Sequence, residues 1–234
     1  MKILKKLCVI STLLVSSAYA DDHFYYKNEG ELLFKMKAFY DDLDTKPKFD
    51  SDITNTGNPG QIVSAAYGVE GSVSYFFNAN FAMELGTGVG YMNIKKSEID
   101  KVANAVAEAN NTTPGDMDRK DMFMVPFSAI MQYHIAPYGA IRPFVGVGYS
   151  AMLLNTRSDQ ISVSSAHGPV VQVGVDLITR DDTFFTIEAK QYFMDTRLKF
   201  DKSLFDTANQ SVDSIKSTMK LNPLIISIGF GYKF

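Results

Sequence analysis

Residues 223–234 read Pro-Leu-Ile-Ile-Ser-Ile-Gly-Phe-Gly-Tyr-Lys-Phe, and a large apolar side chain occupies every second position of this segment. Leu224, Ile226, Ile228, Phe230, Tyr232 and Phe234 fall on one side of an extended chain, with small or polar residues at most positions between them. A period of two is typical of a β-strand whose two faces meet different surroundings. The segment therefore predicts a strand with one apolar face.

The aromatic end of this segment resembles the closing strand of bacterial outer-membrane β-barrels. Phe230, Tyr232 and Phe234 stand at the positions of the assembly signal in such strands. The resemblance implies that the barrel-assembly machinery is a partner of the chain.

The amino terminus has the organisation of a secretory signal peptide. Lys2, Lys5 and Lys6 precede an apolar run, residues 7–15, and Ala18-Tyr19-Ala20 stands before the acidic residue Asp21. This order predicts cleavage between Ala20 and Asp21. A membrane-spanning helix is the alternative, but it needs roughly 20 apolar residues, and two serines at 16 and 17 shorten the run. We therefore expect a cleaved signal at residues 1–20 and a single domain at residues 21–234.

Composition limits the fold and the partners of the exported domain. The only cysteine, Cys8, lies within the expected signal, so no disulfide is available after cleavage. The signal contains three of the 23 basic residues and none of the 26 acidic residues, which leaves the rest with a formal net charge of −6. That acidity argues against nucleic acid as a partner. Because only helices and closed barrels satisfy their backbone in hydrocarbon, an exported chain without further apolar helices is a soluble domain or a barrel.

The exported domain reads as all-β. Eight segments fit the roughly 9 to 11 tilted residues that cross a bilayer: residues 31–40, 65–77, 81–94, 122–134, 142–154, 169–179, 183–200 and 220–234. Aromatic residues gather near their ends, as in the interfacial girdles of barrels: Tyr40, Tyr67, Phe77, Phe81, Tyr91, Phe123, Tyr133, Phe184, Phe193, Phe200, Tyr232 and Phe234.

The connections between these segments alternate in length. Residues 78–80, 135–141 and 180–182 are short, whereas residues 41–60, 95–121, 155–168 and 201–218 are long and polar. Outer-membrane barrels have short periplasmic turns and long outer loops. A soluble β-sandwich, the alternative, gives no reason for this sorting. The sequence therefore predicts an eight-stranded antiparallel transmembrane β-barrel in the bacterial outer membrane, in contact with its lipid.

One long loop has a helical pattern. Ser97 and Asp100 are placed as a capping box, and Ile99, Val102 and Val106 follow at helical spacing. We expect a short amphipathic helix in the second outer loop, acting either as a lid on the rim or as a ligand gate.

Charged residues occupy the inward positions of the predicted strands. A charge on the lipid side near the midplane costs roughly 2 to 4 kcal/mol, so these residues should face the lumen: Lys35, Lys37, Glu70, Glu84, Arg142, Asp176, Glu188 and Lys190. Eight strands leave an interior just wide enough for side chains or one small ligand. Paired charges there favour a structural plug over a conducting or binding role, because buried charges persist chiefly when paired.

Two glycines face long charged residues if the short turns are tight. Gly88 should lie opposite Glu70, and Gly174 opposite Glu188, which makes room for each carboxylate. A bulky residue at either glycine should therefore destabilise the barrel.

The sequence shows no catalytic or metal-binding pattern. His23, His134 and His167 are not spaced as metal ligands on one strand, and G-x-S-x-G is absent. We expect no enzymatic activity, no metal and no cofactor, although scattered catalytic residues can meet in a fold.

Several stretches resemble the OmpW family of outer-membrane proteins, in that family's order: residues 30–37 (Gly-Glu-Leu-Leu-Phe-Lys-Met-Lys), 141–149 (Ile-Arg-Pro-Phe-Val-Gly-Val-Gly-Tyr), 173–176 (Val-Gly-Val-Asp), 192–196 (Tyr-Phe-Met-Asp-Thr) and 221–234. The chain has Asn222-Pro223-Leu224 where relatives usually have Asp-Pro-Trp.

The resemblance implies a narrow, partly apolar barrel for the binding or passage of small hydrophobic molecules. Such a solute would enter from the outer loops, rest above the charged plug and leave sideways between strands. The alternative is a surface antigen or adhesin of the opacity type, whose outer loops contact host molecules. Deleting the second loop should reduce uptake under the first hypothesis and host-cell attachment under the second.

Overall fold

The computed structural model describes residues 30–41, 63–94, 122–135, 139–156, 161–163, 165–180, 182–200 and 215–234. The expected signal peptide and the expected helix of the second loop lie outside these residues. None of the described residues forms a helix of the length and hydropathy needed to cross a bilayer.

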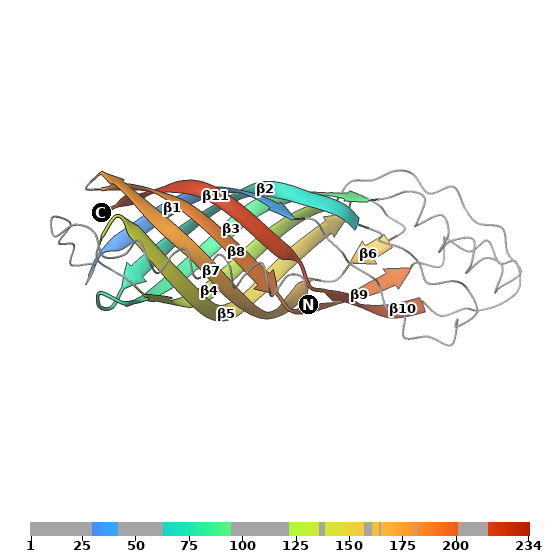
Figure 1. Cartoon of the computed structure of the whole chain (residues 1–234). Helices are drawn as coiled ribbons and strands as arrows, with labels where there is room; N and C mark the ends of the chain where they lie inside the picture. Colours follow the sequence, from blue (N-terminus) through green and yellow to red (C-terminus); the bar gives the residue numbers. More distant parts are fainter. Residues whose placement is uncertain are drawn as a thin grey trace, which may run out of the picture.

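Eight strands close into an antiparallel barrel (Figure 1). They are β1 (Leu32–Asp41), β2 (Val63–Phe76), β3 (Phe81–Ile94), β4 (Met122–His134), β5 (Ile141–Thr156), β7 (Ala166–Arg180), β8 (Thr183–Tyr192) and β11 (Leu224–Lys233). Each strand pairs with the next in this order, and β11 returns to β1, where Met36 faces Phe230. The predicted fold class is therefore confirmed.

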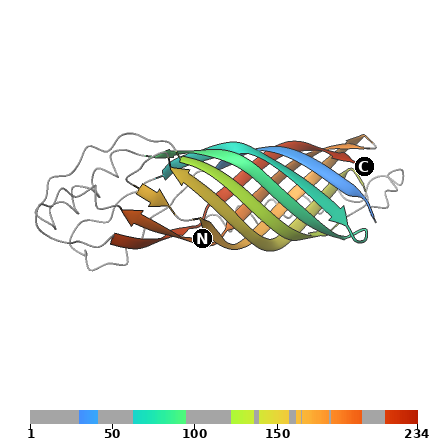
Figure 2. The same ribbon diagram turned by 180° about the vertical axis from the view of Figure 1, so that it is seen from behind.

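Three shorter strands extend one end of the barrel. β9 (Met194–Phe200) and β10 (Ile215–Leu221) pair with each other, and β6 (Ile161–Val163) pairs with β9. They project past the rim, at the end opposite the carboxyl terminus (Figures 1 and 2). The short turns lie at the carboxyl-terminal end, which is the periplasmic end of an outer-membrane barrel.

The predicted continuous strand at residues 183–200 is divided at Phe193, between β8 and β9. The cause lies on the neighbouring strand, β7. The N–H of Phe193 donates to the carbonyl of Pro169 at 2.9 Å, but a proline has no N–H to return. The ladder is interrupted there and resumes in the same register where His167 of β7 faces Asp195 of β9; beyond Phe193 the chain also pairs with β10.

Side chains alternate strictly between lipid and lumen along the barrel strands. β1, for example, has five exposed positions, each followed by a buried one. The exposed set is apolar and includes Val69, Leu85, Val147 and Ile228. The mid-height surface of the cylinder is therefore hydrocarbon-like, as the period of two predicts.

Aromatic rings border this apolar band at both ends. Tyr67, Tyr91 and Phe123 form a row on β2, β3 and β4 at the outer end, with ring centroids 5.9 and 5.0 Å apart. Phe81 and Tyr133 lie 5.1 Å apart at the periplasmic end. The rise from Phe81 to Tyr91 along a strand tilted by about 40° is about 25 Å, the height of the apolar band of outer-membrane barrels.

One aromatic residue lies on the other face from that expected. Phe184 is buried inside the barrel, and its neighbour Phe185 faces the lipid. The inward prediction for Glu188, four residues further along the same strand, already places Phe184 inside. The pairing of β8 agrees, because Phe185 shares a face with Phe230.

A charge introduced in the middle of the lipid face tests the orientation of the strands. Leu85→Arg should lower the free energy of unfolding in lipid vesicles by about 2 to 4 kcal/mol, because the guanidinium would meet hydrocarbon. Asn155→Arg is the matched control. Asn155 is exposed opposite Phe123 at the outer girdle, where the cost is about 0 to 1 kcal/mol. Equal losses in the two variants, measured by denaturant titration, would contradict this membrane placement.

Candidate functional site in the barrel interior

The barrel interior is built in three layers along its axis. An apolar floor at the periplasmic end contains Leu33, Phe76, Ala82 and Phe184. A charged layer follows, and above it lies an apolar layer toward the loop end. The upper layer comprises Phe39, Ala66, Met92, Met124, Ile130, Met152, Ala166, Val170, Tyr192, Met194 and Ile225.

Two lysines and three glutamates form the centre of the charged layer. The Lys37 Nζ lies 2.9 Å from a Glu70 oxygen, 2.8 Å from a Glu188 oxygen and 3.6 Å from a Glu84 oxygen. The Lys190 ammonium contacts the same three carboxylates, at 3.4 Å from Glu84 and 3.3 Å from Glu188, and it also pairs with Glu70. Each ammonium is thus shared by three carboxylates.

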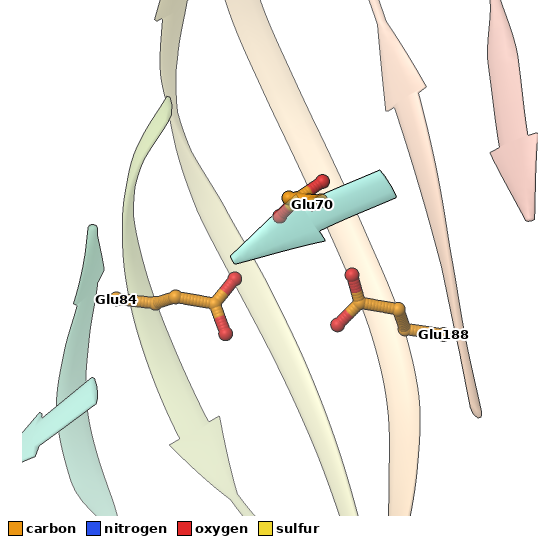
Figure 3. A group of neighbouring side chains, drawn as sticks. All are labelled: Glu70, Glu84 and Glu188. Atoms are coloured by element: carbon orange, nitrogen blue, oxygen red, sulfur yellow. The ribbon is translucent and has the colours of Figure 1, made fainter. Parts of the chain in front are cut away.

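The three carboxylates come from different parts of the wall and point toward one another (Figure 3). One oxygen of each lies within 4.8 Å of the others, a spacing that also suits a cation. In this structure the ammonium groups of Lys37 and Lys190 are those cations. The group is therefore an ion-pair network.

Two glutamines connect the carboxylates. Gln172 Nε2 donates to Glu188 at 2.9 Å and to Glu84 at 3.2 Å. Gln132 Nε2 donates to Glu84 at 3.0 Å and to the Gln172 side-chain oxygen at 2.9 Å. These amides add hydrogen bonds to carboxylate oxygens that are buried in a low local dielectric.

A second ion pair lies next to this network on the periplasmic side. Lys35 Nζ is 3.1 Å from both oxygens of Asp176, and it stands 4.4 Å from the ring centre of Phe144. Arg142 faces Asp176 across β5 and β7, and its Nε donates to the Gly139 carbonyl at 3.2 Å. All eight charged side chains predicted to face the lumen lie inside the barrel, and none is more than 5% exposed.

Close packing against the wall depends on two glycines. Glu70 lies opposite Gly88, and Glu188 lies opposite Gly174, so the predicted register is confirmed. A β-carbon added at Gly174 would stand 2.9 Å from the Glu188 Cβ, and one at Gly88 would stand 3.3 Å from the Glu70 Cβ. Neither position has space for a larger side chain.

The wall itself is interrupted between β3 and β4, beside the upper apolar layer. Pairing runs from Phe81 to Thr87 on β3, skips two residue pairs, and resumes in the same register where Gly90 faces Met124. Pro126 occupies the skipped part of β4 and has no N–H to donate. The interruption lies closer to the outer aromatic row than to the periplasmic one.

A model of the OmpW family matches residues 28–234. The chain belongs to the OmpW family.

The relatives of this OmpW-family barrel are outer-membrane proteins. A protein of Rickettsia typhi named as an outer membrane protein is 34% identical over 247 residues, covering 99% of this chain and 100% of that protein. A counterpart in Rickettsia conorii is 34% identical, covering 94% of this chain and 87% of its own length. The barrel described above therefore lies in the bacterial outer membrane.

Solved structures of similar fold agree with this assignment. The crystal structure of OprG from Pseudomonas aeruginosa has a TM-score of 0.62 at 17% identity, covering 88% of this chain and 96% of that one. The structure of AlkL in lipid bilayers has a TM-score of 0.57 at 15% identity, covering 92% and 95%. At such identities the likeness shows the fold alone.

The structure adds interior residues to those singled out in the sequence. His134 is buried between the rings of Phe76 and Phe144, with centroid distances of 4.8 and 5.2 Å, and its Nε2 is 3.4 Å from the Gln132 side-chain oxygen. His134 lies two residues from Gln132, so the period of two was the signal that places it inward. Gln172 shares a face with the predicted lumen residue Asp176, and it lies inward as the period of two predicts.

Other predicted residues lie elsewhere. Phe230, Tyr232 and Phe234 of the OmpW-family closing strand face the lipid, and the Phe234 N–H donates to the Leu32 carbonyl at 2.9 Å. The predicted cleavage residues, Ala18, Ala20 and Asp21, are outside the described part of the chain. At the periplasmic rim, the pKa of Glu31 is raised above its ordinary value, because the effect of burial exceeds the opposing effect of the nearby Arg142 guanidinium.

Enlarging the two facing glycines should destabilise the barrel. Gly88→Leu and Gly174→Leu each force a side chain into a filled position, which costs about 1 to 3 kcal/mol or more. Gly71→Leu is the control, because a β-carbon there would have no neighbour within 4 Å. Unchanged heat-modifiability on gels for the first two variants would contradict the packing.

Removing one shared lysine should have a larger effect than removing a rim lysine. Lys190→Met leaves three buried carboxylates to share the single ammonium of Lys37, and we expect a loss of about 3 to 5 kcal/mol in the free energy of unfolding. Lys233→Met is the control: Lys233 is 3.4 Å from Glu31 at the rim, and an accessible pair contributes about 0 to 1 kcal/mol. Adding Glu70→Gln to Lys190→Met should recover part of the loss. Equal effects of the two lysine variants would show that the network is not a tightly coupled unit.

Proposed function

We propose that this OmpW-family barrel carries small hydrophobic molecules across the outer part of the outer membrane and releases them sideways into lipid. The solute enters from the loop end, occupies the upper apolar layer and leaves between β3 and β4. The barrel acts as a non-catalytic conduit, without metal or cofactor. The observation that carries the proposal is the interruption at Pro126.

The charged layer supports a sideways path because it closes the axial one. Lys37, Lys190 and the three glutamates fill the cross-section and are almost completely buried. An apolar solute moving along the axis would have to separate these ion pairs, and breaking buried pairs costs several kcal/mol. Ions meet the same obstacle, so the lumen is not an open aqueous pore.

The upper layer supports the binding step. Most of its buried side chains are apolar, although Asp41 is buried at the same height, facing Ala66 and Ile225. Burial of a hydrophobic solute against the apolar side chains is favourable at about 25 cal/mol per Å² of apolar surface. A solute placed there is also level with the wall interruption, because Met124 and Met152 flank Pro126 on β4 and β5.

The interruption supports the release step. Opening a fully paired part of a β-wall in lipid leaves N–H and C=O groups without partners. At Pro126 one donor is absent already, so separation of β3 and β4 exposes fewer unsatisfied groups. Val89 and Phe127 cover this place from the lipid side and are both exposed, which gives the exit an apolar outer border.

The proposal also includes the route by which the barrel reaches the membrane. Residues 1–20 direct export and are removed after Ala20, and the barrel-assembly machinery recognises the closing strand through Phe230, Tyr232 and Phe234. Replacing the strand's terminal Phe234 should therefore reduce assembly more than it reduces the stability of the assembled barrel.

Restoring the missing donor should slow uptake. Pro126→Ala adds an N–H that can complete the β3–β4 ladder, and one more hydrogen bond, worth about 1 kcal/mol, should reduce the opening rate about fivefold. The assay measures entry of the apolar dye N-phenylnaphthylamine into intact cells of a Gram-negative host that lacks its own OmpW-family gene.

Pro143→Ala is the matched control, because Pro143 lies in β5, where pairing with Val175 is unbroken. It should leave dye entry unchanged. Equal dye entry with Pro126→Ala and the native barrel would contradict the exit, and large ungated ion conductance in planar bilayers would contradict the closed lumen.

A further inference from the structure

Met124 lies across the inner side of the wall interruption. Gly90 faces Met124 in the β3–β4 ladder, at the point where pairing resumes above Pro126. A β-carbon added at Gly90 would stand 2.6 Å from the Met124 Cε and 2.9 Å from its Cγ. The Met124 side chain therefore extends over the backbone of β3 and spans the two strands that have to separate.

Phe39 of β1 reaches the same place from the other side. Its Cζ would be 2.8 Å from that added β-carbon at Gly90. Met124 and Phe39 thus lie side by side over a glycine, and both are buried in the upper apolar layer. Contact between a thioether and an aromatic ring is favourable, so we expect these two neighbouring side chains to stabilise each other.

A methionine at this position can move more readily than a β-branched residue. Its side chain is unbranched, has three rotatable bonds and fills irregular spaces. Met92, Met152 and Met194 belong to the same apolar layer, and Met152 faces Pro126 directly. The interior beside the interruption is therefore deformable, whereas the charged layer below it is held by ion pairs.

We propose that Met124 and Phe39 form an inner latch on the β3–β4 interruption, and that this latch selects small planar aromatic molecules over aliphatic ones. The inference rests on the proposed sideways release and names its solute class. An aromatic solute takes the place of the Phe39 ring beside the Met124 sulfur. The sulfur therefore has an aromatic partner while the latch is open. A saturated solute of the same size offers no such exchange.

The first test compares two solutes with the same number of carbon atoms, labelled naphthalene and decalin, in the cell uptake assay. The native barrel should take up naphthalene about fivefold faster, as expected for one sulfur–aromatic contact. Met124→Leu keeps the volume but removes the sulfur, and it should abolish the preference. Met131→Leu, on the lipid face of the same strand, should keep it. The inference is overturned if Met124→Leu keeps the preference, or if the native barrel takes up both solutes at equal rates.

A second measurement separates failure of the latch from failure of the proposed function. The native barrel, labelled at its methionine methyl groups and held in detergent micelles, is titrated with naphthalene and followed by NMR. The Met124 signal, identified by its loss in Met124→Leu, should shift to saturation, whereas the Met131 signal should change in proportion to the naphthalene added. If the native barrel takes up neither solute but Met124 saturates, uptake is wrong and the aromatic site stands. If Met124 does not saturate, the latch is wrong whatever the uptake.

Discussion

A polypeptide in hydrocarbon has no water to satisfy its backbone, and this constraint governs the whole molecule. Each N–H and C=O in the wall needs a partner from a neighbouring strand, so the sheet has to close. Closure with eight strands leaves a bore that side chains alone can fill. The inward residues therefore fill the bore and do not line an open channel. They pack against one another, form ion pairs, or are small enough to leave space for a larger neighbour. The ion-pair network and the glycines beside it follow from that narrow bore.

The side chains that fill the narrow bore differ along the barrel axis. Near the middle, charges balance among themselves, and Glu70 and Glu188 each take the space left by a facing glycine. Toward the loops the filling is apolar and rich in methionine. A rigid, charge-paired layer beneath a soft apolar one gives the barrel a mechanical asymmetry, and the wall interruption lies beside the soft layer, where a small solute can be accommodated.

Much of this architecture was predictable from the period of two and from connection length. These signals placed the strands, the lipid face and the glycine register, because a tight turn fixes which residues face each other. The same two signals failed where a feature of one strand depends on the strand that lies beside it. The division at Phe193, for example, lies opposite Pro169, more than twenty residues away in the sequence. The interruption at Pro126 also needs the partner strand: a proline in a strand is visible in the sequence, but the skipped pairs on β3 are not.

Pairing of β1 with β11 joins the earliest strand of the barrel to the latest one. Up to the moment of that junction, both edges of the growing sheet carry unsatisfied backbone groups, and no intermediate lacking β11 is compatible with an oily environment. A fragment that lacks β11 therefore gains nothing from contact with hydrocarbon, and the backbone of β1 is fully satisfied in lipid only when the carboxyl-terminal strand is present.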